Sequence, residues 1–278
     1  IPTLNNKERL QKCLEGLFKQ SVAQSIIEII VVDNGSTDDT IAYLESLSIR
    51  LLHEPSKSPY KARNKGIQAA SYPIIALLDS NCIPVPEWID AGIKSLEKGD
   101  AAIVCGPITF TYSNPPTITE IADDMVFVSN KVSVVEGSSI PTGQFFTTKE
   151  VFDKVGLFMN DIRSGGDIEW SERATGMGFT LGYALEAEVF YPAKQYDAFI
   201  RKAKRIGKGR VVMRDLKGRA KGLPWWGYSL WISRPPSPVS LYRRMKEKGV
   251  QFGLIRFIGV WWMTWVYRLV RGWWMLVG

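Results

Sequence analysis

Apolar and polar positions along residues 1–193 predict strands and helices in alternation. One stretch has apolar residues at i, i+3, i+4, i+7 and i+8, the spacing of a helix with one buried face: Leu10, Cys13, Leu14, Leu17 and Phe18. A second helix is predicted over residues 61–70. A β-branched run over residues 26–32 predicts a buried parallel strand, and short runs over residues 49–52, 74–78 and 101–105 predict further strands. This alternation favours an α/β fold with a mostly parallel sheet flanked by helices.

Charge and tryptophan content divide the chain into two parts. Residues 1–193 carry 16 basic and 25 acidic side chains, whereas residues 194–278 carry 19 basic and 3 acidic ones. Eight of the ten tryptophans follow Leu223. We therefore predict an α/β domain over residues 1–193 and a basic helical extension over residues 194–278. Because the chain starts at Ile1 without a methionine, we expect the first strand of the domain to be cut short.

Two acidic residues stand directly after predicted strands. Asp33 follows the run 26–32, and Asp79 follows the run 74–78 and opens the tripeptide Asp79-Ser80-Asn81. Ligands of open α/β sheets bind beyond the carboxyl ends of the strands, so both carboxylates should face one crevice. A single acid after a strand is commonly a helix cap. Two acids at equivalent strand ends favour a functional site.

The order of several motifs over about residues 1–210 resembles that of the family 2 glycosyltransferases. The motifs are Ile1-Pro2-Thr3-Leu4-Asn5, Val31-Val32-Asp33-Asn34-Gly35-Ser36-Thr37-Asp38, Ala62-Arg63-Asn64-Lys65-Gly66, Asp79-Ser80-Asn81, Thr142-Gly143-Gln144, Val155-Gly156-Leu157-Phe158 and Gly166-Asp167-Ile168-Glu169-Trp170. Each motif is short, but their order and spacing together are specific. The resemblance implies a GT-A fold, with residues 1–193 as the catalytic domain, and transfer of a hexose from a nucleotide diphosphate sugar with inversion.

The resemblance places the nucleotide-sugar donor at the strand ends and on the helix that follows them. The residues it assigns to the donor are Pro2, Thr3, Asn5, Asp33, Asn34, Arg63, Asp79 and Ser80. Asp33 would accept the imide N–H of uracil, which favours a UDP-sugar over a GDP- or dTDP-sugar; the alternative is that its carboxylate only forms a turn. Arg63 would contact phosphate or a carboxylate; the alternative is a solvated helix face.

A divalent ion, Mg²⁺ or Mn²⁺, is also implied by the resemblance, with Asp79 and Asn81 as its ligands. Oxygen ligands suit Mg²⁺, which keeps several waters and takes few protein carboxylates. Here Asn81 replaces the second carboxylate of the family's Asp-x-Asp motif, and Tyr191 stands where the family often has a histidine ligand. We therefore expect weak metal binding. The one histidine of the chain, His53, is expected to be an ordinary loop residue.

Asp167 matches the family's catalytic base, the carboxylate that deprotonates the acceptor hydroxyl. It follows Arg163-Ser164-Gly165-Gly166 at the start of a predicted helix, so the alternative is that it only caps this helix. Glu169 is expected to position the acceptor. Further contacts with the acceptor or with phosphate are expected from Gly143, Gln144 and Arg205.

Basic and apolar residues of the C-terminal part predict contact with anionic groups and with a membrane. Six cations crowd residues 201–210, which indicates phosphates of substrates or lipid headgroups rather than nucleic acid: Arg201, Lys202, Lys204, Arg205, Lys208 and Arg210. A helix is predicted over about residues 254–277. Its polar sector holds Arg256, Thr264, Arg268 and Arg271, and its apolar sector holds Ile258, Trp262, Trp265, Leu269, Trp273 and Leu276.

This helix is expected to lie in the plane of an anionic membrane surface. Trp262, Trp265 and Trp273 would sit at headgroup level, with Arg268 and Arg271 on anionic lipid. Only 11 uncharged residues stand in a row from 257 to 267, fewer than the roughly 20 that a membrane span needs. The alternatives are a helix that packs on the enzyme's own core or on a dimer partner, and a tilted span.

The three cysteines form no Cys-x-x-Cys pair, which indicates a reducing compartment. The sequence thus predicts a cytoplasmic, inverting glycosyltransferase, peripheral on the inner face of the cell membrane. It would build a polysaccharide or glycolipid by transfer to a saccharide or lipid-linked acceptor. One rival is a sugar-phosphate nucleotidyltransferase, which would need a Gly-rich basic loop after the first strand. The other is an inert membrane-bound scaffold, which the presence of Asp79 and Asp167 disfavours. The motifs leave the sugar, the linkage and the oligomeric state open.

Overall fold

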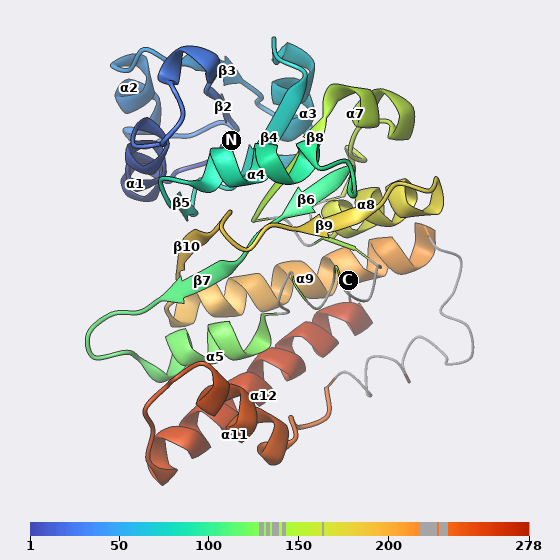
Figure 1. Ribbon diagram of the computed structural model, residues 1–278. Helices are drawn as coiled ribbons and strands as arrows, with labels where there is room; N and C mark the ends of the chain where they lie inside the picture. The colour runs from blue at the N-terminus through green and yellow to red at the C-terminus, as the bar shows by residue number, and fades with distance from the viewer. Residues whose placement is uncertain are drawn as a thin grey trace. The chain divides into compact units, whose positions relative to one another are not determined.

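The computed structural model divides the chain into two compact units (Figure 1). The first comprises Ile1–Thr109 and Val128–Tyr191, and the second comprises Phe110–Phe127 and Pro192–Gly278. The structure describes residues 1–127, 131, 134, 139–140, 143–162, 164–216, 227 and 233–277. The second unit thus joins the C-terminal residues to a stretch from the middle of the chain, which the sequence pattern had placed in the N-terminal domain.

Three parallel strands form the first sheet of the first unit, in the order β1-β2-β3. They are β1 (Pro2–Thr3), β2 (Ile30–Asp33) and β3 (Arg50–His53), and they are connected through α1 (Lys7–Phe18), the 3-10 turn η1 (Gln24–Ile26) and α2 (Thr40–Glu45). Thr3 lies opposite Asp33, and Asp33 lies opposite His53. All three strands therefore end at one edge, which is where a ligand of such a sheet binds.

The second sheet has the order β4-β8-β6-β9 and mixes strand directions. Its strands are β4 (Ile74–Leu78), β6 (Ile103–Cys105), β8 (Gln144–Thr148) and β9 (Leu181–Tyr183). The short strands β5 (Ile83–Pro84), β7 (Ile108–Thr111) and β10 (Val189–Pro192) form a separate sheet of order β5-β10-β7. β8 runs antiparallel to β4 and β6, whereas β6 and β9 are parallel. The α/β class is confirmed. Strand directions are more mixed than expected, because β8 inserts antiparallel between β4 and β6.

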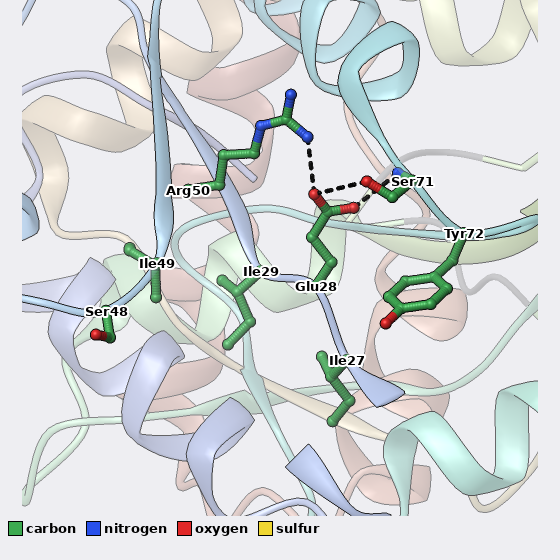
Figure 2. Close-up of a pocket in the computed structure, with 8 residues that line it drawn as sticks. All are labelled: Ile27, Glu28, Ile29, Ser48, Ile49, Arg50, Ser71 and Tyr72. Atoms are coloured by element: carbon green, nitrogen blue, oxygen red, sulfur yellow. Dashed lines mark hydrogen bonds and ion pairs between the residues drawn. The ribbon is translucent and has the colours of Figure 1, made fainter. Parts of the chain in front are cut away.

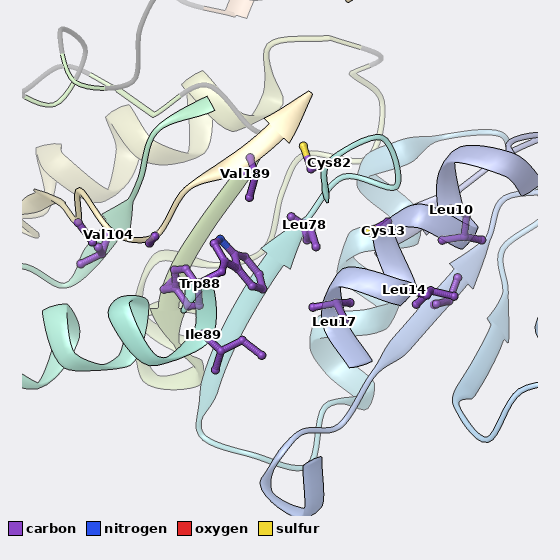
Figure 3. Packing of buried hydrophobic residues seen from close by; sticks show 14 of the residues in the cluster. Leu10, Cys13, Leu14, Leu17, Leu78, Cys82, Trp88, Ile89, Val104 and Val189 are labelled. Atoms are coloured by element: carbon purple, nitrogen blue, oxygen red, sulfur yellow. The ribbon is translucent and has the colours of Figure 1, made fainter. Parts of the chain in front are cut away.

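An apolar core joins the helices of the first unit to its sheets (Figure 3). Other helices in the described part of this unit are α3 (Pro59–Ala69), α4 (Trp88–Glu97), α7 (Lys149–Val155) and α8 (Gly166–Gly176). The stripe predicted on α1 is buried at four positions, Leu10, Cys13, Leu14 and Leu17, while Phe18 is 43% exposed. Trp88 lies 4.6 Å from the Phe146 ring, centroid to centroid. A Cβ at Gly92 would lie 2.5 Å from that ring, so α4 needs glycine there to approach the sheet.

In the described part of the second unit, four long helices share a core that holds Ile121, Phe199, Val260 and Tyr267. The helices are α5 (Ile118–Val126), α9 (Tyr196–Leu216), α11 (Pro238–Glu247) and α12 (Leu254–Val277). Glycines let α12 approach its neighbours closely. A Cβ at Gly207 of α9 would lie 2.5 Å from the Arg271 carbonyl oxygen, and one at Gly259 would lie 2.6 Å from the Ile118 side chain.

Acidic side chains of α5 form ion pairs with some of the basic side chains of this unit. Asp123 is fully buried and accepts hydrogen bonds from Lys202 Nζ, at 2.6 Å, and from the backbone N–H of Lys194. Asp124 accepts from Tyr112 Oη at 2.5 Å and from Lys248 Nζ. Lys202, one of the six cations expected to contact phosphate, therefore forms a structural ion pair.

α12 buries part of its polar sector and leaves apolar side chains exposed. Thr264 is 2% exposed, and the Arg271 guanidinium stands 5.7 Å from the Tyr267 ring centroid within the unit. Five residues of the opposite side, which we call the apolar stripe, are exposed: Ile255, Ile258, Trp262, Leu269 and Trp273. Arg271 itself is half-buried, and its contact with lipid stays a prediction. No helix among the described residues combines the length and hydropathy of a membrane span.

Candidate active site

Asp33 ends β2 as a buried carboxylate that organises the turn after it. Its oxygens accept hydrogen bonds from the backbone N–H groups of Gly35, at 3.0 Å, and Ser36, at 3.1 Å. Gly35 adopts a φ of +88°, in the left-handed region that glycine tolerates without strain. His53 Nδ1, on an exposed ring, lies 4.0 Å from Asp33 Oδ2. The turn-forming role is therefore observed, and a contact with uracil remains a prediction.

The residues that follow β1 and those that follow β2 are hydrogen-bonded to each other at this edge of the sheet. Pro2 and Thr3 form β1, and the Asn34 N–H donates to the Thr3 carbonyl at 2.8 Å. Asn5, with a φ of +48°, accepts from the Thr37 N–H at 2.7 Å and donates its own N–H to Ser36 Oγ. The loop after the first strand and the turn after the second thus form one bonded structure.

Asp79 follows β4 and pairs with Arg63 of α3. Arg63 Nη2 donates to Asp79 Oδ1 at 2.5 Å, and the arginine side chain is 7% exposed. The alternative of a solvated helix face is wrong for Arg63, because it is buried within this pair. Burial alone would lower the pKa of Arg63, but the nearby carboxylates of Asp79 and Asp167 raise it. A permanent positive charge is therefore held beside the expected metal ligand.

Asn6 was not predicted as a site residue, yet it connects two loops of the site. Its Nδ2 donates to Ser80 Oγ at 3.0 Å and to Asn81 Oδ1 at 3.1 Å. It also stands at the N-cap of α1, and this cap position was the only sequence signal available. Asn6 thus fixes the loop that carries Asp79 against the loop after β1.

Asp167 lies in the first turn of α8, after Gly165, whose φ of +88° turns the chain into the helix. Its Oδ1 accepts from Tyr60 Oη at 2.9 Å. Tyr60 belongs to α3, as Arg63 does, and Pro59 and the Ser58 cap fix where that helix begins. The structure therefore brings Asp33, Asp79 and Asp167 into one network through strand-end loops and a single helix.

Other residues expected at the site have different surroundings. Glu169 forms a two-point ion pair with Arg173, at 2.9 and 3.1 Å, so its contact with an acceptor stays a prediction. Gln144 is 1% exposed and bonds Trp88 Nε1 and the Ala187 carbonyl, which assigns it to the core. Gly143 accepts from the Asp79 N–H and packs on Ile108. Arg205 lies on α9, which belongs to the second unit, so its contact with phosphate or the acceptor stays a prediction.

No three His, Cys, Asp or Glu side chains among the described residues come together as a metal-binding group. The oxygens available for a cation are those of Asp79 and Asn81, one carboxylate and one amide. Tyr191, at the position of the family's histidine, packs on the apolar core instead.

A surface hollow of about 620 Å³ lies at the opposite end of the parallel strands (Figure 2). Residues that precede or start β2 and β3 line it, among them Glu28 and Arg50. Glu28 accepts from the Ser71 N–H at 2.7 Å and from Arg50 Nη1 at 2.8 Å, so these polar groups bond one another. Since ligands of such sheets bind at the carboxyl ends of the strands, this hollow is not the candidate active site.

Likeness to solved structures identifies the fold as GT-A, the fold of a large class of sugar-transferring enzymes. The chain matches mannosyltransferase PcManGT from Pyrobaculum calidifontis, solved with GDP-Man and Mn²⁺, with a TM-score of 0.64 and 13% identity over 99% of this chain and 85% of that chain. It matches TarS 1–349 from S. aureus with a TM-score of 0.53 and 15% identity over 97% and 88%. At these identities the likeness shows the fold alone.

Sequence comparison gives the family. Residues 1–155 match the family model described as glycosyl transferase family 2. Glycosyltransferase AglE from Haloferax volcanii is 30% identical over 98% of this chain and 92% of its own length. A dolichyl N-acetyl-α-D-glucosaminyl phosphate glucuronosyltransferase from Methanococcus voltae is 25% identical over 77% and 72%. The chain belongs to glycosyl transferase family 2 and is a glycosyltransferase, which confirms the resemblance and sets aside the nucleotidyltransferase rival.

Proposed function

We propose that the chain transfers a hexose from a nucleotide diphosphate sugar, with inversion, to a saccharide or lipid-linked acceptor at a membrane surface. One observation carries the proposal: helix α3 holds two carboxylates of the site. Tyr60 and Arg63 lie three residues apart, on one face of the helix, and bond Asp167 and Asp79 respectively. Helix α3 thereby holds both Asp167, the proposed base for the acceptor, and Asp79, the proposed binding group for the donor diphosphate.

Asp167 is the group that accepts the acceptor's proton. As the acceptor oxygen bonds to the anomeric carbon, the bond from that carbon to the diphosphate oxygen breaks. The hydroxyl proton moves to the Asp167 carboxylate, and the nucleoside diphosphate leaves with the electron pair. A single displacement of this kind inverts the anomeric configuration.

Thr3, Asp33 and Asn34 are proposed to hold the nucleotide. In the part of the chain that the structure describes, Thr3 Oγ1 and Asn34 Oδ1 are buried without a hydrogen-bond partner. Buried polar atoms are nearly always paired, so these two support a ligand at this edge. A carboxylate has lone pairs beyond those that the turn uses, so Asp33 can also accept the uracil imide N–H. The neighbour solved with GDP-Man makes a GDP-sugar the competing donor.

The oxygens of Asp79 and Asn81 fit a weakly held Mg²⁺ or Mn²⁺, since Mg²⁺ commonly takes one or two protein ligands together with substrate phosphates. A bound ion would stabilise negative charge on the departing diphosphate. Arg63 supplies positive charge at the same place from the protein itself.

α12 is proposed to lie on the inner face of the cell membrane with the apolar stripe in the lipid. The stripe is 41–87% exposed at its five positions, and contiguous exposed apolar surface marks an interaction site. Cations contact another part of the same helix: Lys204 and Lys208 of α9 lie 4.1 and 4.5 Å from the ring centroid of Trp274, which is outside the stripe. Basic side chains at this place favour anionic headgroups. The Methanococcus voltae relative is named for a dolichyl phosphate-linked sugar, which supports an acceptor presented by a membrane.

A transfer assay tests this function. The protein is incubated with UDP-, GDP- or dTDP-hexoses, Mg²⁺ or Mn²⁺, and vesicles that contain lipid-linked acceptors, with and without a chelator. We expect transfer from one nucleotide class, most simply UDP, dependent on vesicles and reduced by the chelator, with the product anomer inverted by NMR. The absence of transfer and of donor hydrolysis with all three classes would contradict the proposal.

A further inference from the structure

The phenol of Tyr60 is bonded to one oxygen of the proposed base. Tyr60 Oη donates to Asp167 Oδ1 at 2.9 Å, and the Gly166 N–H donates to Tyr60 Oη at 2.9 Å. Tyr60 is 3% exposed and Asp167 is 8% exposed. Because a backbone N–H only donates, the phenol proton has to point to the carboxylate. The hydrogen bond therefore runs in one fixed direction, from Tyr60 to Asp167.

Three contacts hold the Tyr60 ring in place. The Phe158 ring lies 5.6 Å away between centroids, and the Arg63 guanidinium stands 5.2 Å from the Tyr60 centroid. A Cβ at Gly166 would lie 2.9 Å from the phenol carbon of the ring. Residue 166 must therefore lack a side chain for the phenol to reach both the backbone and the carboxylate.

We propose that Tyr60 is a positioning residue for the base. It holds Asp167 Oδ1 so that Oδ2 is directed to the acceptor hydroxyl, and through α3 it links this orientation to the Arg63–Asp79 pair at the donor. The proposal rests on the proposed function, in which Asp167 is the base.

Tyr60 acts as a donor only. Burial, and then the neighbouring Asp167 carboxylate, raise the pKa of Tyr60 above its ordinary value of 10. The phenol thus keeps its proton at any pH at which the enzyme works, and it cannot replace Asp167 as a base. Its contribution is the orientation of a carboxylate whose misplacement by about 1 Å can cost on the order of 100-fold in rate.

Tyr60→Phe tests the proposal, because it removes one oxygen and keeps the ring contacts. We expect kcat to fall about 10- to 100-fold, with little change in KM for the donor. The pH–rate profile should also change, because Asp167 loses the hydrogen bond that Tyr60 donates. Tyr112→Phe is the matched control: it removes a phenol that donates to the buried Asp124 in the second unit. That variant should leave kcat and the profile unchanged.

Two further variants keep the result interpretable. Gly166→Ala should also lower kcat, because its Cβ displaces the ring while the Tyr60 oxygen stays. In the Asp167→Asn background, Tyr60→Phe should cost little more, because Tyr60 acts only through Asp167. If Tyr60→Phe folds, binds donor and works at the wild-type rate with an unmoved profile, the positioning role is overturned. A wild-type protein without transfer activity, or an active Asp167→Asn variant, would instead overturn the proposed function.

Discussion

Each unit of this glycosyltransferase buries a carboxylate beside a phenol, and the two pairs are built differently. In the second unit, Asp124 accepts from Tyr112 and also from Lys248, so a lysine of the helical unit neutralises it. In the first unit, Asp167 accepts from Tyr60, while the arginine of the same helix is committed to Asp79. Burial of an acid therefore does not mark a catalytic group. What separates the two is the rest of the surroundings: Asp124 is paired with Lys248, whereas the tyrosine that bonds Asp167 shares its helix with the arginine that bonds Asp79.

The largest expected effect concerns the carboxylate of the first unit. Asp167→Asn keeps the size of the side chain but cannot take a proton, and general-base catalysis is worth about 10²–10⁴-fold. We expect kcat to fall by that factor while UDP binds with unchanged affinity by calorimetry. Asp124→Asn, the corresponding change in the second unit, should lower the melting temperature and spare kcat. Near wild-type turnover of Asp167→Asn would mean that this residue only caps α8.

A second prediction concerns the stability that the acids of α5 provide. Asp123 is fully buried and paired with Lys202, whose side chain is 14% exposed. Removing one partner of a buried pair leaves the other uncompensated, at a cost of about 3–5 kcal/mol. Asp123→Ala should therefore lower the free energy of unfolding in urea by an amount in this range, with donor binding retained. A loss below about 1 kcal/mol, as for exposed pairs, would show that Lys202 finds water or another partner.

Local patterns predicted much of the first unit. The α1 stripe, the strand over residues 74–78 and the two strand-end acids depend on residues close together in the sequence. Asn6 and Tyr60 could not be found in this way, because their partners lie 74 and 107 residues further along the chain. Likewise, nothing local indicates that residues 110–127 join the C-terminal helices, whose lysines neutralise Asp123 and Asp124.

The sequence pattern of α12 predicted which residues form its polar and apolar sectors, but not what surrounds each sector in the folded protein. A helical wheel shows that two faces differ, and it does not show which face the rest of the protein covers. The arginine sector was expected to face outward. The structure covers only part of it: Thr264 and Gly272 are buried, whereas Arg256 and Arg268 donate to backbone carbonyls at the surface. The apolar stripe is exposed as well.

A third prediction tests whether that exposed side binds lipid. Burying one large apolar side chain is worth about 1.5–3 kcal/mol, so Leu269→Ser should weaken partition into anionic vesicles by about 10-fold or more. Leu185→Ser, an equally simple change at an exposed leucine of the first unit, is the control and should have no effect. Deleting α12 would be a poorer test, because Val260 and Tyr267 belong to the core of the second unit. Equal flotation of both variants would assign the stripe to a protein partner.

The smallest expected effect concerns an acid of the first unit that lies away from the site. Burial would raise the pKa of Glu28, but hydrogen bonds from Ser71 and Arg50 outweigh it and hold the pKa below the ordinary 4.5. A lowered pKa adds stability that is present above pH 4.5 and is lost as the pH falls through the folded-state value. Because the pair is partly solvated, Glu28→Gln should cost less than about 1 kcal/mol at pH 7. The difference in melting temperature from wild type should shrink below pH 4.5, and kcat should not change. A loss of kcat would connect this end of the sheet to catalysis. The first unit would then offer no distinction between an acid that acts in catalysis and an acid that only stabilises the fold.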